Sequence, residues 1–406
     1  MVTRQAVDFD VLIAGGGLVG ACCAAALAQS GVSVAVLEAR APTLQFDPTT
    51  IDLRVSAISR ASERIFRHLA AWDGMVRRRV SPYREMHVWD SAGAGAVHFD
   101  SADIAEPSLG YIIENRVIQA ALWERLQSLP NVTLLCPSTV ASWELRDNAI
   151  HVRTTEQRVW RARLLIGADG ADSRVRELAN IVAHGWMYDQ HAVVAAVTTE
   201  QPHADTAWQR FLPDGPLAFL PLNNGQCSIV WSTTPTHAAQ LLELDDAAFA
   251  ATLEVTFAGR LGRILHCGPR ASFALRLQYA QRYVRSRIAL IGDAAHSVHP
   301  LAGQGANLGF LDAAALAEVV VAAAAAGLDI GDERVLARYE RWRKGDNVLM
   351  MGAMDGIKRL FGPVPAPLVW LRNAGLQLTD QLTPAKEFFI RRAMGLNGDL
   401  PELARR

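Results

Sequence analysis

Asp10-Val11-Leu12-Ile13-Ala14-Gly15-Gly16-Gly17-Leu18-Val19-Gly20 is a short apolar run that leads directly into a glycine-rich turn of the form G-x-G-x-x-G. The apolar run predicts a buried strand, residues 21–29 predict a helix, and residues 32–37 predict a second strand. In such a βαβ unit Gly15 permits a tight turn, Gly17 lets the backbone approach a pyrophosphate, and Gly20 lets helix and strand pack closely. The stretch therefore predicts a Rossmann-like α/β domain that binds a dinucleotide, with FAD and NAD as alternatives.

The residues beside this turn supply the polar groups that a dinucleotide requires. The N-terminus of the helix that follows the turn directs unpaired N–H groups and a partial positive charge at the phosphates. Glu38 ends the second strand, with Ala39 after it, and is placed to accept hydrogen bonds from both hydroxyls of an adenosine ribose.

Length and composition limit the remaining function classes. At 406 residues the chain exceeds the usual single core, so we expect two domains and an appendage. A net charge of −1, without clustered Lys and Arg residues, argues against a nucleic-acid-binding function. The five cysteines are scattered, so neither a disulfide framework nor a zinc site is expected, and a reducing cytoplasm suits them. Neither an export signal nor a membrane span is evident, which leaves peripheral contact with the inner face of the cytoplasmic membrane open.

Two later junctions repeat the pattern of a strand that ends in a Gly/Asp turn. Asp169-Gly170 follows the apolar run at 163–167, and Gly292-Asp293 follows the run at 288–291. On residue type alone Asp169 is equally well a turn or helix-cap residue, with Ser173 and Arg176 as solvated helix positions.

The three motifs in this order resemble the class A flavoprotein aromatic monooxygenases, and the resemblance spans roughly residues 8–345. It implies an FAD-binding domain in two parts, at 1–185 and 284–345, with a small excursion into the substrate domain near 80–110. It also implies an inserted mixed α+β sheet domain that binds substrate, at 186–283, and a C-terminal helical region at 346–406.

The resemblance also implies roles for individual residues. Asp293 would accept from a ribityl hydroxyl, Pro300 and residues 301–305 would line the isoalloxazine, and Asn307 would sit at its pyrimidine edge. Arg116 would lie near the pyrophosphate or ribityl chain, and Val140 would offer backbone to the adenine. The full set of residues implied to bind FAD is Gly15, Gly17, Leu18, Val19, Gly20, Glu38, Ala39, Arg54, Arg116, Val140, Asp169, Gly292, Asp293, Pro300, Gly303, Gln304, Gly305, Ala306 and Asn307.

Within that family, residues 299–312 and 207–222 look like the ring hydroxylases of ubiquinone biosynthesis, and residues 392–401 resemble the bacterial C5-hydroxylases. The implied reaction reduces FAD with NAD(P)H or another donor, forms a C4a-hydroperoxide with O2, and hydroxylates a polyprenylated phenol or quinol. Hydroxylation at C6 or C1, or with broad specificity, remains an alternative. So do a hydroxylase of soluble aromatics and a flavin-binding scaffold in a membrane-associated complex of quinone-biosynthesis proteins.

The roles of the aromatic residues, the two histidines and the C-terminal tail have more than one interpretation. Trp208, Phe211, Phe219 and Trp231 either line a pocket for a phenol ring or pack in a core. No catalytic base and no metal ligands are identified, and a bracing role for His296 and His299 is favoured over a catalytic one. The apolar and basic tail after residue 345 either meets a membrane surface, packs on its own protein, or joins subunits of a homo-oligomer.

Overall fold

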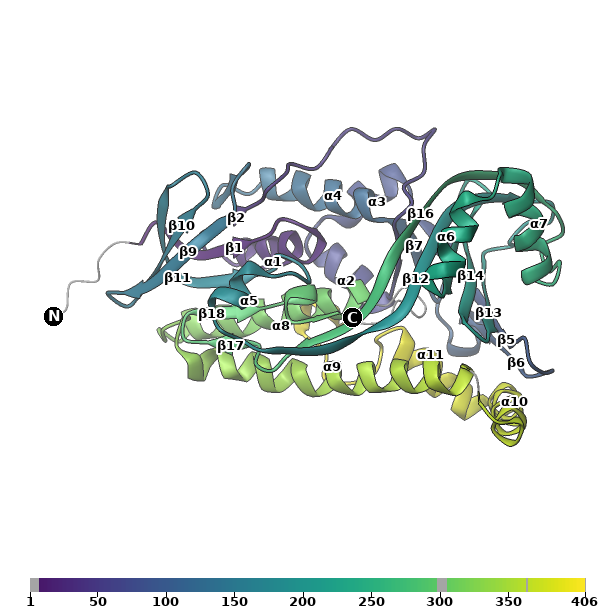
Figure 1. The fold of residues 1–406 in the computed structure, drawn as a ribbon. Coiled ribbons are helices and arrows are strands. Elements are labelled where there is room, and N and C mark those ends of the chain that lie inside the picture. The colour runs from purple at the N-terminus through teal and green to yellow at the C-terminus, as the bar shows by residue number, and fades with distance from the viewer. Residues whose placement is uncertain (1–6, 298–304, 363, 406) are drawn as a thin grey trace.

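The computed structural model describes residues 7–297, 305–362 and 364–405 (Figure 1). The expected flavin residues Pro300, Gly303 and Gln304, and also His299, lie outside these ranges. The fold is mixed α/β, as expected, and consists of a dinucleotide-binding part built on one eight-stranded sheet and a second part built on another.

The first sheet has a parallel centre, in the order β17-β18-β11-β1-β2-β8, because its central strands are nearly continuous apolar runs buried on both faces. Strands β9 and β10 extend it as an antiparallel hairpin beside β11. The strands are β1 (Phe9–Ala14), β2 (Val34–Leu37), β8 (Val132–Leu135), β9 (Val140–Arg146), β10 (Ala149–Thr154), β11 (Val159–Gly167), β17 (Val284–Arg285) and β18 (Ile288–Leu290).

Helices cover this sheet, and α1 packs against both α4 and α8, while α9 packs on the outer side of α8. The helices of this part are α1 (Leu18–Gln29), α2 (Arg60–His68), α3 (Trp72–Arg78), α4 (Asn115–Gln127), α5 (Arg174–Leu178), α8 (Gly305–Ala325) and the first half of α9 (Glu333–Phe361). Among the described residues α8 is the one helix long and apolar enough to cross a membrane, yet 72% of its apolar window is buried inside the fold. It is the core helix of this part.

The second sheet runs β19-β16-β12-β15-β14-β13-β5-β6 and is antiparallel except between β13 and β5. Its outer strands β5 and β6 come from residues 85–100, well before the other strands of this sheet in the chain. The strands are β5 (Glu85–Asp90), β6 (Ala96–Asp100), β12 (Ala183–Thr199), β13 (Thr206–Leu212), β14 (Gly215–Pro221), β15 (Cys227–Thr233), β16 (Ile264–Ala280) and β19 (His296–Ser297). Helices α6 (Pro235–Glu243) and α7 (Asp246–Thr256) cover one face and share an apolar core with it.

Two long paired strands, β12 and β16, run from the dinucleotide-binding part into the second part and join the two (Figure 1). A third, small sheet consists of β3 (Val55–Ile58), β7 (Gly110–Glu114) and β4 (Ser81–Tyr83), in that order. The two parts therefore meet along these strands, where the carboxyl ends of β1 and β18 also point.

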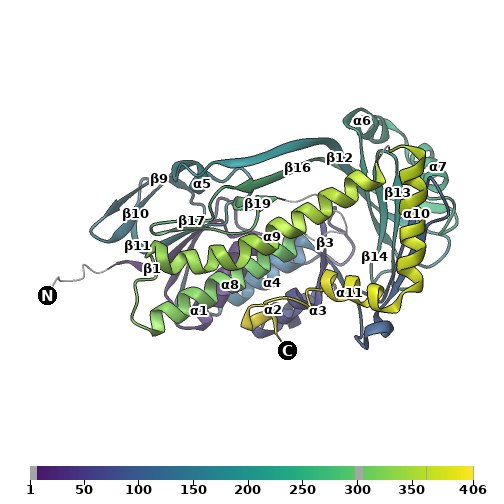
Figure 2. The same cartoon turned by 90° about the horizontal axis from the view of Figure 1, so that it is seen from below.

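The C-terminal tail folds back on its own protein. Helix α9 passes position 345 without a break, and α10 (Ala366–Gln381) and α11 (Thr383–Ala393) follow it along the second sheet (Figure 2). The buried Arg372 side chain makes a two-pronged ion pair with Asp90 of β5, at 2.6 and 3.0 Å, and Ile390 and Met394 are buried. One face of the tail is thus buried against the rest of the same chain.

Candidate functional site

The glycine-rich turn shows why each glycine is required. Gly15 has φ +99°, and a Cβ there would lie 2.4 Å from the Ala168 carbonyl oxygen. A Cβ at Gly20 would lie 1.9 Å from the Gly15 carbonyl oxygen, so α1 can approach the turn only without a side chain. At Gly17, the N-cap of α1, a Cβ would have no atom within 4 Å. Gly15 and Gly20 are required by the protein itself, whereas Gly17 borders open space at the helix N-terminus.

Glu38 stands beside this turn, as its position at the end of β2 predicts. Its Oε2 accepts a hydrogen bond from the Gly16 N–H at 2.7 Å, and its Oε1 accepts from the Arg40 N–H at 3.0 Å. The buried Trp123 indole donates to the Gly16 carbonyl at 2.7 Å and holds the turn from the α4 side. Val140 lies at the start of β9, close to the same sheet end, because the Ser138 N–H bonds the Glu38 carbonyl at 2.8 Å.

The Asp169 turn is a helix cap that is tied to the third motif. Asp169 accepts hydrogen bonds from the Val175 N–H at 3.0 Å and from the Ser173 hydroxyl, at the N-terminus of α5. Arg176 is buried rather than solvated, and it donates to the carbonyls of Ala294 at 2.9 Å and Ala171 at 2.7 Å. This arginine joins the Asp169-Gly170 turn to the Gly292-Asp293 turn.

A buried polar network fixes the Gly292-Asp293 turn. Asp312 of α8 is fully buried, and its carboxylate accepts from the His296 ring at 2.5 Å, the Gly292 N–H at 3.2 Å, and Arg343 and Asn347 at 3.1 Å each. Burial opposes its ionisation, but the charges and hydrogen bonds of His296, Arg343 and Asn347 outweigh burial and lower the pKa of Asp312. The arrangement makes His296 a bracing residue, as favoured from the sequence.

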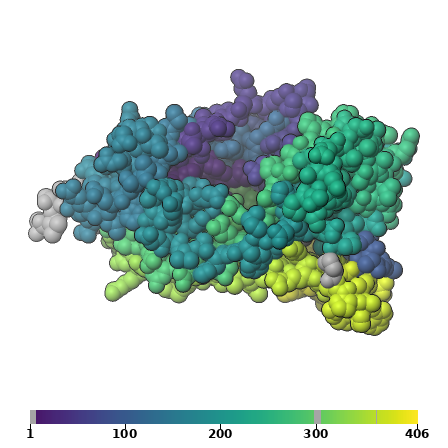
Figure 3. Space-filling view, viewed as in Figure 1, coloured from purple at the N-terminus to yellow at the C-terminus, as the bar shows by residue number. Residues whose placement is uncertain are grey.

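Beneath these turns lies a cavity of about 920 Å³ between the dinucleotide-binding part and the second sheet. Figure 3 shows the molecular surface hollowed between these two parts. Residues from all three motifs line the cavity, together with the start of α8 and one face of the second sheet. The motif and helix residues are Gly17, Leu18, Val19, Arg54, Ala168, Gly170, Asp293, Gly305 and Ala306.

Asp293 points into this cavity, and its side chain is accessible from it although protein surrounds the carboxyl group. Burial raises the pKa of Asp293, while His296, Arg54 and Arg276 act in the opposite direction. Gly292 has φ +57°, and Val19 of α1 packs against it and against Gly309 of α8. The Gly292-Asp293 motif thus places the Asp293 carboxylate at the cavity wall, next to a glycine, which has no side chain.

The Asn307 side chain is engaged by three partners from earlier in the chain. Its amide donates to the Ala57 carbonyl at 2.7 Å and accepts from the Ser59 N–H at 3.0 Å and the Ser62 hydroxyl at 2.7 Å. These partners tie the first turn of α8 to β3 and α2. Asn307 therefore aligns the N-terminus of α8, whose partial positive charge faces the cavity through Gly305 and Ala306.

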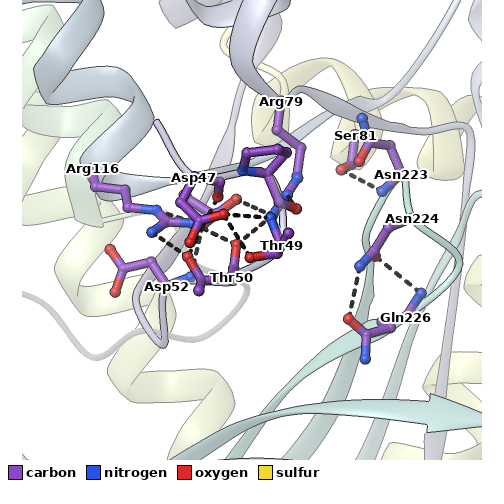
Figure 4. A network of polar contacts seen from close by, with 12 residues as sticks. Asp47, Thr49, Thr50, Asp52, Arg79, Ser81, Arg116, Asn223, Asn224 and Gln226 are labelled. Carbon is purple, nitrogen blue, oxygen red and sulfur yellow. Dashed lines mark hydrogen bonds and ion pairs between the residues drawn. The ribbon is translucent and has the colours of Figure 1, made fainter. Parts of the chain in front are cut away.

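Arg116 contacts the segment that precedes two cavity-lining residues (Figure 4). It donates to the Thr50 carbonyl at 2.6 Å, to the Thr50 hydroxyl at 3.0 Å and to Glu114 at 2.9 Å. Segment 47–52 is held in this way, and the residues that follow it, Leu53 and Arg54, line the cavity. The structure does not place Arg116 itself among the lining residues.

The second sheet turns one face toward α6 and α7 and the other toward the cavity. Trp208, Phe219 and Trp231 pack in the apolar cluster covered by α6 and α7. The residues that alternate with these three face the cavity: Gln209, Ala218, Leu220, Val230 and Ser232. Phe211 shares the Gln209 face of β13 and stacks on Phe361 with ring centres 3.9 Å apart. Core packing is thus the role of those aromatics, and the cavity floor is built from smaller side chains.

Away from the cavity, Glu85, His87 and His98 come together on β5 and β6, with possible ligand atoms within 4.8 Å of one another. His98 bonds Glu85 at 3.0 Å, and His87 stacks between His98 and Trp208. Burial, with the charges of His98 and Arg260, lowers the pKa of His87. A hydrogen bond and a stack of rings account for this group.

The comparisons with known proteins agree with this geometry. Residues 8–347 match the family model described as "FAD binding domain". The chain is 39% identical over 387 residues to the 3-demethoxyubiquinol 3-hydroxylase of Escherichia coli (strain K12), covering 95% of this chain and 98% of that protein. It is 40% identical over 399 residues to the ubiquinone hydroxylase UbiL of Rhodospirillum rubrum, covering 98% and 92%.

A human relative, the mitochondrial ubiquinone biosynthesis monooxygenase COQ6, is 36% identical, with 93% of this chain and 91% of that protein covered. Among solved structures, the p-nitrophenol 4-monooxygenase PnpA of Pseudomonas putida superposes with a TM-score of 0.78 over 96% of this chain and 98% of that one. At 19% identity that similarity supports the fold alone. The chain belongs to the FAD-binding-domain family and, within it, to the class A FAD-dependent aromatic monooxygenases of the ubiquinone-biosynthesis hydroxylase type.

Proposed function

We propose that this enzyme hydroxylates the aromatic ring of a polyprenylated phenol or quinol in ubiquinone biosynthesis, at C5, with FAD held at the cavity between the two parts. The observation that carries the proposal is the convergence of the three motifs on one cavity whose other wall is the second sheet. The names of the E. coli, R. rubrum and human relatives support the substrate class.

The residues present fit FAD. The open space at Gly17 and the start of α1 would receive the pyrophosphate, and Glu38 would exchange its hydrogen bond with Gly16 for the adenosine ribose. Asp293 would accept from the ribityl chain, and the N-terminus of α8 would face the pyrimidine end of the flavin. Bound FAD supplies the redox chemistry and the activation of O2 at its C4a atom.

The chain's own residues have the remaining tasks, which are to hold the ring, exclude water and stabilise negative charge on reduced flavin. The positive N-terminus of α8 serves the last task, and the apolar floor formed by Ala218, Leu220 and Val230 serves the first two. The electron donor in this proposal is NAD(P)H.

Profiling of quinone intermediates after deletion of the gene tests the ring position. A precursor without the C5 oxygen is the expected accumulating species. Accumulation of a demethoxyubiquinol, the compound in the name of the E. coli relative, would reassign the reaction to that later step.

Replacing Asp293 with alanine is expected to weaken FAD binding about 10- to 100-fold, because a hydrogen bond to a charged acceptor is lost inside the cavity. Titration of the apoprotein with FAD, followed by flavin fluorescence, measures the change. The same variant tests the scaffold alternative. Asp293→Ala protein without FAD is expected to fail to complement a deletion strain, whereas complementation would show that catalysis by this chain is not needed.

We further propose that the outer face of the tail contacts an anionic membrane surface, where a polyprenylated substrate resides. Trp370 is 72% exposed, Phe388 59% and Phe389 52%, and the last turn of α11 carries Arg391 and Arg392.

Replacing Trp370 and Phe388 with aspartate is expected to reduce co-sedimentation with phosphatidylglycerol vesicles about tenfold or more. Val255→Asp, at an apolar residue 79% exposed on α7, is the control. Equal sedimentation of all three proteins would favour a hydroxylase without a membrane role.

A further inference from the structure

The floor of the cavity contains a buried polar group that the protein leaves without a partner. Gln209 on β13 is only 6% exposed and lines the cavity. Its neighbours two residues away on the same face of the strand, Ala207 and Phe211, are both apolar and buried. Gln209 therefore interrupts an apolar face at the position that meets the cavity.

The amide of Gln209 makes no hydrogen bond within the described part of the chain. A buried amide without a partner is unfavourable, so such groups persist where a ligand or water completes them.

A second unpartnered polar group faces the same cavity. Ser232 on β15 is 2% exposed, and its hydroxyl has no hydrogen bond among the described residues. In the sheet Gln209 pairs with Ala218, and Ala218 with Val230, so Ser232 lies two strands from Gln209 and two residues along. The two polar groups are separated by the small apolar side chains of Ala218 and Val230, which leave room for a flat ring.

We infer that Gln209, assisted by Ser232, is the subsite that recognises oxygen substituents of the aromatic ring. This inference rests on the proposed function. The amide oxygen accepts from a ring hydroxyl and the amide N–H donates to a ring oxygen, whereas neither group can remove a proton. Gln209 is thus a ring-positioning residue that turns the ring carbon toward the flavin, and it is not a base.

The test is ligand binding to the FAD-loaded enzyme, followed by the change in flavin absorbance. The two probes are a phenol with a short ortho-prenyl chain and its methyl ether, which lacks the hydroxyl donor. Wild-type enzyme is expected to bind the phenol about 10- to 100-fold more tightly than the ether. Gln209→Met, which keeps the side-chain volume but removes the amide, is expected to lose this preference by weakening phenol binding alone.

Ser232→Ala is the milder second variant and is expected to reduce the preference by a smaller factor with little effect on folding. Gln240→Leu, on the exposed surface of α6, is the control and should behave as wild type. FAD affinity should be unchanged in all variants. Product formed per NADPH oxidised should fall in Gln209→Met, since a misplaced ring leaves reduced flavin to react with O2 without hydroxylation.

Two outcomes would overturn the inference while sparing the proposed function. One is a Gln209→Met enzyme that still prefers the phenol as wild type does; the other is equal weakening of phenol and ether, which would mark Gln209 as structural. A wild-type holoenzyme that neither binds nor hydroxylates the phenol would contradict the proposed function itself, and this inference with it.

Discussion

Gly17→Val is expected to lower FAD affinity about 100- to 1,000-fold while leaving the fold intact. The backbone at Gly17 has φ −67°, which any residue adopts, and a Cβ there meets no protein atom within 4 Å. A valine side chain would instead occupy the space assigned to the pyrophosphate and block the approach of phosphate to the start of α1. Isothermal titration of apoprotein with FAD gives the affinity, and urea unfolding of the apoprotein gives the stability.

Two glycines provide the comparison for this variant. Gly352→Val, at an exposed and uncrowded helical position of α9, should retain wild-type FAD affinity. Gly20→Val should fail to fold, because its Cβ would lie 1.9 Å from the Gly15 carbonyl oxygen. Wild-type FAD affinity in Gly17→Val would show that the dinucleotide does not lie at this turn.

Asp312→Ala is expected to lower the free energy of unfolding by about 3–5 kcal/mol, because it leaves Arg343 and His296 buried without their shared carboxylate. Loss of the bond to the Gly292 N–H should also loosen the Gly292-Asp293 turn and so weaken FAD binding. Urea unfolding at pH 7 measures the first effect. Asp346→Ala is the matched control, since Asp346 also contacts Arg343 but is 38% exposed.

The stabilisation by Asp312 should depend on pH in a defined direction. Its neighbours lower the pKa of Asp312 below its ordinary value of 3.8, so its contribution is fully present above that value and is lost as the pH falls through the lowered pKa. The difference between wild type and Asp312→Ala should therefore shrink in strong acid. A difference that is already absent at pH 7 would contradict the buried ion cluster.

The parts of the fold that follow from local pattern were predictable from the sequence. The strand, glycine turn and helix at residues 10–29 need only apolar periodicity and glycines at fixed offsets, and the structure confirms them.

Residues whose partners lie far along the chain were not predictable in the same way. Asn307 bonds residues about 250 positions away, and Arg176 bonds Ala294 across two motifs. Alternation divides β13 into two faces, but nothing in the β13 sequence shows that α6 and α7 cover the face of Trp208. For that reason the sequence alone does not tell that Trp208 packs in a core while Gln209 beside it lines the cavity.

We propose above that this chain uses FAD to insert an oxygen atom from O2 into a phenolic ring, and one experiment tests this directly. The direct measurement is a single turnover of FAD-loaded enzyme, reduced anaerobically with dithionite, mixed with an ortho-prenylated phenol and then with ¹⁸O2. Mass spectrometry should show a hydroxylated product that carries one ¹⁸O atom on the ring. Reoxidation of the flavin with unaltered phenol, or a product oxygen derived from water, would contradict the account.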